Sequence, residues 1–293
     1  MSIQVELPIN QKLSLIDEGL NFSPIRLISR GEHSLIYAVK IKEDYCALKW
    51  FKIQSNVEYK SFLDKILTRI TQVDFPHTSF LWPSAVCVNP RNVHHSGNLT
   101  FGGIGYFMRL KGKKFLDSIG YVNGTFEINE SNLIKACSNI ASAIACLHDK
   151  KMFHRDISLN NILIDSSSGQ IQICDNEFVG LLQMQGSSTI ELQIDHALKG
   201  SPGFIAPENL QHSRHSANTD NYSLAAVIYS LLTGTHIKNL GISDNFPKID
   251  LLDIPSCKKS GIKKLLHYAL SEEQNTPPRR PTAREWYELL SEG

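Results

Sequence analysis

The stretch Phe153–Asp165 reads FHRDISLNNILID, and most of what this sequence predicts follows from it. The polar cluster 154–156 (His-Arg-Asp) is followed five residues later by Asn161. The apolar run 162–164 comes next and is typical of a short buried strand. A second apolar run, beyond Asp165, ends in Asp175. Two strands that each deliver a carboxylate or an amide to one edge predict a site for Mg²⁺ and phosphate, because Mg²⁺ prefers hard oxygen ligands.

Composition describes an ordinary globular protein. Of 293 residues, 42% are hydrophobic and 20% are charged, which is enough to build a sizeable core. The 30 basic and 29 acidic residues give a net charge of only +1. The net charge therefore predicts neither nucleic acid nor a membrane surface as a partner. The longest apolar stretch, 224–232, is far shorter than the ~20 residues of a membrane helix. The oligomeric state is left open.

Six cysteines show neither a CxxC pair nor a metal-ligand spacing with histidine. Several lie in apolar runs, which favours small core residues in a reducing setting. The N-terminal residues 1–12 lack a basic region followed by an apolar one, so no signal peptide is predicted. We therefore expect a cytoplasmic protein.

Secondary-structure patterns change character along the chain. Alternating or apolar runs at 25–27, 35–41 and 45–51 predict strands, and 56–71 predicts a helix. After about residue 114, apolar residues recur at helical spacing. Further helices are predicted over 133–147, 222–233, 262–270 and 282–290, the last with a Thr282/Glu285 capping box. Strands first and helices afterwards predict an α+β chain with two lobes.

At this point the residues resemble the eukaryotic-like protein kinase family, and the resemblance covers most of the chain. His154-Arg155-Asp156 with Asn161 is similar to the catalytic loop H-R-D-x-x-x-x-N of that family. Five further pieces occur in the family's order: Ala47-Leu48-Lys49 for V-A-I-K, Asp175 for the first residue of DFG, 200–208 for the activation-segment end, Asp220 with its apolar helix, and 280–282 for R-P-T.

The resemblance implies a bilobal kinase fold, with a small β-rich N-lobe and a larger, mainly helical C-lobe. Residues 1–293 would form a single kinase domain, with the N-lobe at 1–108, a hinge at 109–112 and the C-lobe at 113–293. It also implies ATP and Mg²⁺ as cofactors and a protein as substrate, with transfer of the γ-phosphate to Ser or Thr hydroxyls. The sequence does not say which protein.

Residue roles are implied in the same way. Asp156 would accept or orient the substrate hydroxyl, Asn161 and Asp175 would hold Mg²⁺, and Lys49 would bind the α- and β-phosphates. Further nucleotide contacts would come from Ser29, Gly31, Ser34, Ile36, Ala47, Met108, Leu110 and Leu163. Phe107 would guard the rear of the adenine pocket as a gatekeeper.

The partner of Lys49 is left open between two acids. Glu58 shares a helical face with Phe62 and Ile66 and is the first candidate. Ser55-x-x-Glu58 is also a capping box, in which Glu58 would only bond the start of the helix. Asp64 is the second candidate.

Two structural roles are also implied in the activation segment. Glu208 would pair with Arg280 and anchor the segment. Arg155 would receive a phosphate on Ser187, Ser188 or Thr189, since Arg clusters order phosphorylated loops; the alternative is that these three residues are an ordinary polar linker.

Three departures from the family pattern stand out. Serines replace two glycines of the phosphate-covering loop, at 29 and 34, so only Gly31 survives. The DFG position reads Asp175-Asn176-Glu177, which is similar to some divergent bacterial kinases; Glu177 is interpreted as a solvated acid or, alternatively, a metal ligand. Ser158 replaces the catalytic-loop lysine and could only hydrogen-bond the γ-phosphate. These losses keep a pseudokinase or nucleotide-binding scaffold open as the alternative function, with a small-molecule kinase as a distant third.

Overall fold

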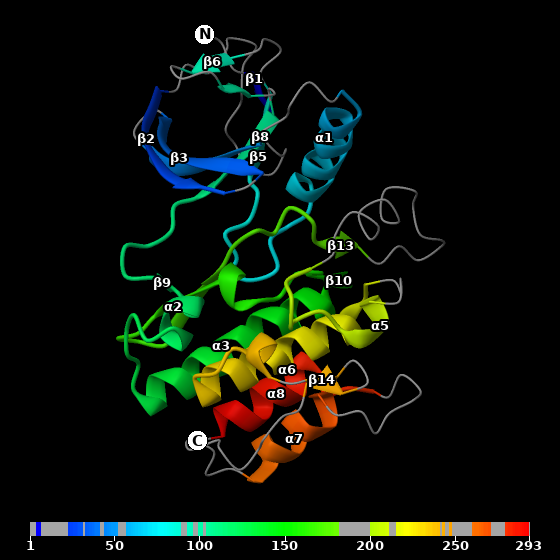
Figure 1. Cartoon of the computed structure of the whole chain (residues 1–293). Coiled ribbons are helices and arrows are strands. Elements are labelled where there is room, and N and C mark those ends of the chain that lie inside the picture. Colours follow the sequence, from blue (N-terminus) through cyan, green and yellow to red (C-terminus); the bar gives the residue numbers. More distant parts are fainter. Residues whose placement is uncertain are drawn as a thin grey trace. The chain divides into compact units, whose positions relative to one another are not determined.

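The computed structural model describes residues 4–6, 23–31, 33–41, 44–51, 57–88, 93–95, 99–101, 104–181, 200–210, 215–240, 242–243, 246–247, 260–270 and 279–292. The candidate phosphorylation sites at 187–189, Ser55 and the side chain of Glu58 lie outside this description. The chain divides into two compact units (Figure 1). The first comprises Met1–Phe75 with Leu81–Gly112, and the second comprises Pro76–Phe80 with Lys113–Gly293.

The first unit is built on a six-stranded sheet in the order β1-β5-β8-β4-β3-β2. Its strands are β1 (Gln4–Glu6), β2 (Ser23–Arg30), β3 (Ser34–Ile41), β4 (Asp44–Phe51), β5 (Ala85–Val88) and β8 (Ile104–Arg109), and β6 (Val93–His95) pairs with β7 (Leu99–Phe101). Helix α1 (Val57–Thr71) packs near β5 and β8. Its buried residues recur at helical spacing, at Leu63, Ile66, Leu67 and Ile70.

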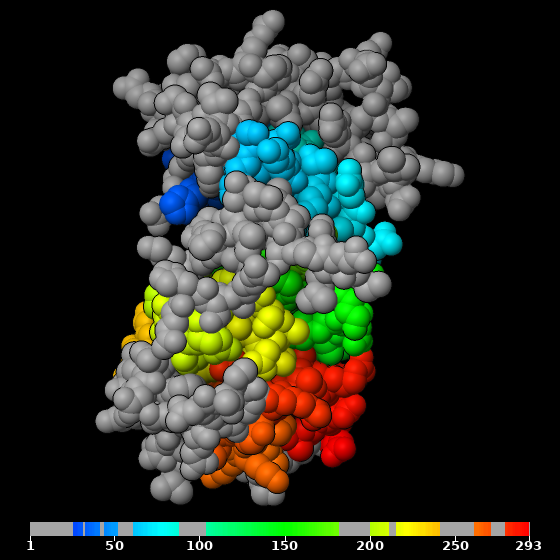
Figure 2. Space-filling view, turned by 90° about the vertical axis from the view of Figure 1, so that its right-hand side faces the viewer, coloured from blue at the N-terminus to red at the C-terminus, as the bar shows by residue number. Residues whose placement is uncertain are grey.

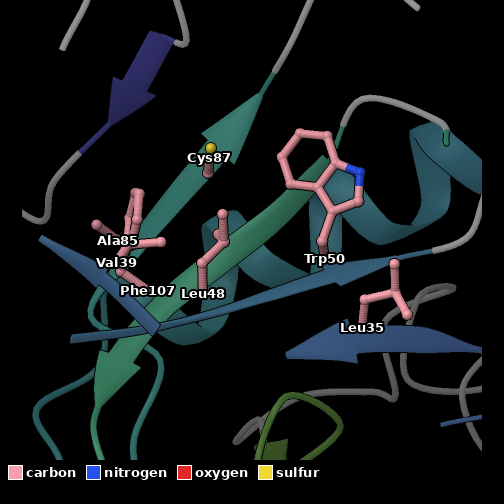
Figure 3. Close-up of a cluster of buried hydrophobic side chains, with 7 residues drawn as sticks. All are labelled: Leu35, Val39, Leu48, Trp50, Ala85, Cys87 and Phe107. Carbon is pink, nitrogen blue, oxygen red and sulfur yellow. The ribbon is translucent and has the colours of Figure 1, made fainter. Parts of the chain in front are cut away.

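One face of this sheet carries a core of buried side chains, contributed by four strands: Leu35, Val39, Leu48, Trp50, Ala85, Cys87 and Phe107 (Figure 3). Leu48 lies directly opposite Phe107, and Phe107 lies directly opposite Ala85. Directly opposed residues share a face of the sheet, and successive residues of a strand alternate between its two faces. The core residues therefore show which residues of these four strands lie on the opposite face.

The second unit is mainly helical (Figure 1). Its helices are α2 (Ser118–Val122), α3 (Glu130–Asp149), α5 (Pro207–Leu210), α6 (Ala217–Thr233), α7 (Ser260–Leu270) and α8 (Ala283–Ser291), with 3₁₀ turns η1 (Leu159–Asn161) and η2 (Ile237–Asn239). Helix α3 packs extensively on α8, and α7 and α8 lie side by side on the face shown in Figure 2.

The short strands of the second unit support its loops. Strand β11 (Ile162–Asp165) pairs with β12 (Gln170–Ile173) and β9 (Leu116–Asp117). The remaining pairs are β10 (Met152–Phe153) with β13 (Gly180–Leu181), and β14 (Ile242–Ser243) with β15 (Phe246–Pro247). Phe80 forms a parallel bridge with Ile173, so the segment 76–80 extends the β11–β12 hairpin.

Helix ends follow the local chemistry of the chain. The Thr282/Glu285 capping box predicted for the last helix is confirmed: Glu285 N donates to Thr282 Oγ1, and Thr282 N donates to Glu285 Oε2 at 2.8 Å. Helix α6 begins at a second capping box, Ser216 with Thr219, and ends at Gly234 with φ +63°. Its residues from 219 to 232 are all buried, which confirms the buried central helix. Within the described residues, no helix combines the length and the apolar character that crossing a membrane requires.

Candidate active site

Strand register gathers the nucleotide-binding candidates of the first unit on one face of the sheet. Ile36 lies opposite Lys49, and Ala47 lies opposite Met108. Ala47 and Lys49 are two residues apart on β4, so these four side chains share the face opposite the Leu48–Phe107 core. Ala47 and Met108 are 2% and 4% exposed. Leu110 follows the end of β8 and is half-buried.

Phe107 was expected to guard the rear of the adenine pocket, and that expectation is wrong. Phe107 packs in the core with Leu48 and Ala85 (Figure 3). Lys49 is the neighbour of Leu48 on β4, so its side chain lies on the opposite face. Tyr106, the neighbour of Phe107, lies directly opposite Lys49 instead. A shift of one residue along a strand moves a side chain to the other face. Ile104, Tyr106 and Met108 are therefore the β8 residues on the Lys49 face.

Lys49 is a buried cation, only 5% exposed. Its ammonium lies 5.8 Å from the centroid of the Phe51 ring, and Phe51 is 6.2 Å from Tyr106, ring centroid to ring centroid. A lysine at a solvated sheet edge would not be buried in this way. Of its two candidate partners, Asp64 is exposed on α1, which does not favour it; Glu58 lies in the same helix, and its side chain is outside the description.

The loop between β2 and β3 is short and partly open. Ser29 lies opposite Ile36 and is exposed, as is Gly31, whereas Ser34 is only 9% exposed. Gly31 N donates to Ser34 O at 2.9 Å. A Cβ added at Gly31 would meet nothing closer than 3.5 Å, so packing within the protein does not require this glycine. Gly105 differs, because a Cβ there would lie 2.4 Å from the carbonyl oxygen of Lys49.

In the second unit, the β11–β12 hairpin brings Asn161 and Asp175 to one edge, as the spacing predicted. Asn161 immediately precedes β11, Asp175 follows β12, and Ile162 lies opposite Ile173. Cys174 N donates to the carbonyl oxygen of Asn161 at 2.9 Å, which ties the two strand ends together. Asp175 has φ +58°, an unusual backbone conformation for an aspartate. Leu163 is buried at the centre of the same three-stranded sheet.

The carboxylate of Asp156 accepts a hydrogen bond on each oxygen. Asn161 Nδ2 donates to Asp156 Oδ2 at 2.9 Å and to its carbonyl oxygen at 2.9 Å. Ser201 Oγ donates to Asp156 Oδ1 at 2.8 Å. Because the Asn161 amide nitrogen faces Asp156, its oxygen Oδ1 is the atom able to bind a metal ion. That oxygen and the Asp175 carboxylate are both hard oxygen donors, the ligand type that Mg²⁺ prefers.

The backbone of the catalytic loop is held by Asp220, which is 1% exposed. Its carboxylate accepts from His154 N at 2.5 Å and from Arg155 N at 3.0 Å, and it contacts His148 Nε2 at 3.1 Å. Burial raises the pKa of Asp220, but the hydrogen bonds and charge of His148 and the contribution of His154 outweigh burial and lower it. A buried carboxylate thus fixes the backbone two residues before Asp156.

Arg155 is buried and strained. Its φ is +75°, and its side chain is turned inwards: Nη1 donates to Phe178 O at 2.7 Å, and the guanidinium lies 4.8 Å from the Phe153 ring centroid. Backbone strain of this kind concentrates at functional sites, where the surrounding structure enforces it. Its proposed role as a phosphate receptor concerns residues 187–189, outside the description.

Two sequence-based interpretations are corrected by burial. At most a hydrogen bond to the γ-phosphate was expected of Ser158, but it is fully buried, and its hydroxyl has no hydrogen-bond partner among the described residues. From that position it cannot contact a phosphate. Glu177 was interpreted as a solvated acid, but it is only 2% exposed. Neither position could be inferred from the composition of the loop, because burial depends on residues far away in the sequence.

The predicted pairing of Glu208 with Arg280 is confirmed. Arg280 Nη1 and Nη2 donate to the two carboxylate oxygens of Glu208 at 2.5 and 2.8 Å, a bidentate geometry. Arg280 Nη1 also donates to Asn218 O at 3.1 Å, and its guanidinium lies 5.1 Å from the Tyr222 ring centroid. Burial raises the pKa of Glu208, but the hydrogen bond and charge of Arg280 outweigh burial, so the pKa is lowered overall. This pair joins α5 to the loop before α8.

Two residues of this site belong to motifs recognised in the sequence, but the sequence did not predict their contacts. Ser201 was part of the activation-segment resemblance, yet its bond to Asp156 spans 45 residues. Asp220 is an acid in the first turn of a helix whose later residues, 224–232, are mostly apolar, and a carboxylate buried there needs hydrogen-bond donors. In both cases the partner is a loop distant in sequence.

Comparison with known proteins identifies the family. A family model described as the protein kinase domain matches residues 109–290. The receptor-like cytosolic serine/threonine-protein kinase RBK2 of Arabidopsis thaliana is 24% identical over 261 residues, 87% of this chain and 51% of the relative. Myosin light chain kinase A of Dictyostelium discoideum is 24% identical over 210 residues, 71% of this chain and 64% of the relative.

A shorter match is closer in identity. Serine/threonine-protein kinase 33 of Bos taurus is 33% identical over 117 residues, 38% of this chain and 23% of that protein. The chain spans about half the length, or less, of the first curated relatives it matches. The family model covers more than half of the chain and includes the catalytic loop, the β11–β12 hairpin and the Glu208–Arg280 pair. The chain belongs to the protein kinase domain family.

Proposed function

We propose that this chain is an ATP- and Mg²⁺-dependent protein kinase that transfers the γ-phosphate to Ser or Thr hydroxyls of proteins. The observation that carries the proposal is the setting of Asp156. Its carboxylate is oriented by Asn161 and already accepts a hydrogen bond from an aliphatic hydroxyl, that of Ser201, at 2.8 Å. A substrate serine or threonine presents the same chemical group. Its hydroxyl would be oriented by Asp156 for in-line attack.

The metal and nucleotide contacts are proposed residue by residue from the family pattern. Asn161 Oδ1 and the Asp175 carboxylate would hold Mg²⁺, which neutralises charge on the phosphates when bound. Lys49 would bind the α- and β-phosphates, and Ile36, Ala47, Met108, Leu110 and Leu163 would surround the base. Glu58 stays the proposed partner of Lys49. The first 108 residues would form the N-lobe and 109–112 the hinge.

Gly31 supports a phosphate contact through the space beside it. Because packing within the protein does not demand a glycine at this position, close approach of a ligand to the backbone is a physical reason for its presence. Ser29 and Ser34 would contact the phosphates from either side. The surviving glycine would allow binding that is weaker than three glycines would give.

A second candidate, a nucleotide-binding scaffold with little catalysis, is favoured by one observation. The buried hydroxyl of Ser158 supplies neither a charge nor a hydrogen bond to a phosphate, so the site contains one cation fewer than the family pattern. The four residues Lys49, Asp156, Asn161 and Asp175 favour catalysis, because a protein that only binds nucleotide has no need of Asp156.

An assay of radioactive phosphate transfer distinguishes the protein kinase from the nucleotide-binding scaffold. The purified chain is incubated with γ-labelled ATP, Mg²⁺ and a basic protein substrate, beside Asp156→Ala and Lys49→Met. We expect wild-type transfer, and losses of at least about 100-fold in both variants, because general-base and phosphate-clamp groups each contribute this much. Lys40→Met is the matched control: Lys40 lies on the neighbouring strand and contacts Tyr45. It should retain transfer within about twofold, as surface substitutions do.

The alternative outcomes are distinct. Transfer by wild type no faster than by Asp156→Ala would contradict the kinase function. A rise in melting temperature with Mg·ATP that Lys49→Met removes would then establish the scaffold. Acid hydrolysis of the labelled substrate distinguishes phosphoserine and phosphothreonine from phosphotyrosine. We also propose a cytoplasmic location, where the cysteine thiols would stay reduced.

A further inference from the structure

A continuous chain of hydrogen bonds runs through Asn176, the residue that stands where related kinases have a phenylalanine. Asn176 is completely buried. Its Nδ2 donates to the carbonyl oxygen of Ile173 at 2.9 Å. A carbonyl oxygen can only accept, so this bond fixes the orientation of the amide and turns Oδ1 towards His154. The distance from Asn176 Oδ1 to His154 Nε2 is 3.0 Å.

The imidazole of His154 continues this chain towards Asp156. The backbone N–H of Asp156 donates to His154 Nδ1 at 3.3 Å, so Nδ1 is an acceptor without a proton. The ring proton is therefore on Nε2, from which it is donated to Asn176 Oδ1. The ring is 1% exposed, and its centroid lies 6.3 Å from that of Phe80, stacked at 24°. One tautomer and one orientation satisfy all of these contacts.

This chain of bonds connects both acids of the site. At one end is the backbone N–H of Asp156 itself. At the other end the Asn176–Ile173 bond closes a tight turn around Asp175, whose φ of +58° needs enforcement by its surroundings. A phenylalanine at 176 would fill the space but could not accept the Nε2 proton.

We propose that Asn176 is a positioning residue for phosphoryl transfer, acting through the tautomer of His154 to hold Asp156 and through Ile173 to hold the turn at Asp175. The inference rests on the proposed kinase function. A residue that only filled space could be replaced by an apolar side chain of the same size. A positioning residue could not, because replacement leaves the buried Nε2 proton without an acceptor and frees the ring.

A double-mutant cycle tests the coupling. Asn176→Leu and His154→Phe both break the bond between these two residues, and each should lower kcat by about 10- to 100-fold, as loss of a supporting hydrogen bond does at other sites. KM for ATP should change by less than about threefold, because Lys49 and the residues proposed around the base are not altered. The double variant should be no slower than the slower single variant, since a chain broken once transmits nothing further. A double variant whose loss in kcat equals the product of the two single losses would overturn the proposal.

Asn123→Leu, at an exposed asparagine in the same unit, is the matched control and should keep the wild-type kcat.

Nitrogen NMR of histidine-labelled protein provides a measurement independent of activity. The His154 signals, assigned by their loss in His154→Phe, should show a protonated Nε2 and a bare Nδ1 in wild type, and a mixture of tautomers in Asn176→Leu. If Asn176→Leu does not fold, Asn176→Asp retains an acceptor and should keep the Nε2–H tautomer. A protonated Nδ1 in wild type, or an unchanged tautomer in Asn176→Leu, would overturn the proposal.

The two failures are distinguishable. A wild-type protein that transfers no phosphate contradicts the proposed function, whereas the tautomer of His154 is read in the same protein whether or not it transfers phosphate.

Discussion

The β-rich unit and the helical unit hold their site residues by different physical means. In the sheet, four residues share one face: Ile36, Ala47, Lys49 and Met108. An apolar core occupies the other face, and the strand register places these four residues opposite one another. In the helical unit, the catalytic loop is held by a few buried polar bonds, above all those of Asp220. Placement in the sheet is thus spread over many apolar contacts, whereas placement in the loop depends on individual side chains.

If the comparison is right, removing the charge of Asp220 should have the largest effect. Asp220→Asn places an amide N–H against the backbone N–H of His154 or Arg155, both buried donors. We expect the free energy of unfolding to fall by about 3 kcal/mol or more, and transfer to fall with it. Urea unfolding followed by tryptophan fluorescence measures the change.

Asp149→Asn is the matched control, at an acid in the same unit. Its side chain is 59% exposed and pairs with the exposed Arg284, so its loss should cost less than about 1 kcal/mol. Equal effects of the two substitutions would contradict the view that the loop depends on Asp220.

The Glu208–Arg280 pair should have an intermediate effect that depends on pH. The pKa of Glu208 is lowered in the folded protein from its ordinary value of 4.5. Its stabilising contribution is therefore complete above about pH 4.5 and is lost as pH falls through the lower, folded-state pKa. Glu208→Gln should reduce the free energy of unfolding by about 2 kcal/mol at pH 7, less than for a fully buried pair, because the glutamate side chain is 30% exposed.

The same variant should show a flatter decline in stability than wild type as pH falls below about 4.5, so the two curves converge in acid. Urea midpoints between pH 7 and 3.5 test this. Glu127→Gln, an exposed glutamate of the same unit, should keep the wild-type midpoint at pH 7. A difference between Glu208→Gln and wild type that grows towards low pH would show that the sign is wrong.

The smallest effects are expected from substitutions on the two faces of β8. Met108→Trp adds bulk on the Lys49 face and should weaken Mg·ATP binding by about tenfold, because overpacking costs on the order of 1–3 kcal/mol. Phe107→Leu should leave the Kd for Mg·ATP within about threefold and lower stability by about 1 kcal/mol through the core. Titration with a fluorescent nucleotide and thermal melting measure both quantities. The opposite ranking of the two Kd values would restore Phe107 to the nucleotide side.

Much of the fold could be predicted from local patterns. The capping box at Thr282, the buried helix α6 and the β11–β12 hairpin each depend on residues close together in sequence. Motif spacing likewise predicted that Asn161 and Asp175 would meet, because a hairpin returns the chain to the same edge. The resemblance to divergent bacterial kinases stays a prediction, as does the identity of the protein substrate.

Other features could not be predicted from local patterns. Phe107 and Met108 are both apolar and adjacent, and only the register of four strands decides which one faces Lys49. Glu177 is acidic, yet it is buried, and Asn176 is polar, yet it lies completely inside. Their placement depends on packing partners distant in the chain. Secondary-structure propensity and hydrophobic periodicity are local properties and do not report such partners.

By itself, the sequence determined the family, the change from strands to helices and the acids and amide of the catalytic loop, because these follow from residue types at short spacing. Only the tertiary structure decided which face each strand residue occupies, how Asp220 reaches across 66 residues to the backbone of His154, and that Asn176 completes a bonded chain to Asp156. The physical reason is that strand register and buried hydrogen bonds are selected jointly by the whole core, and no single segment contains enough of its partners to specify them.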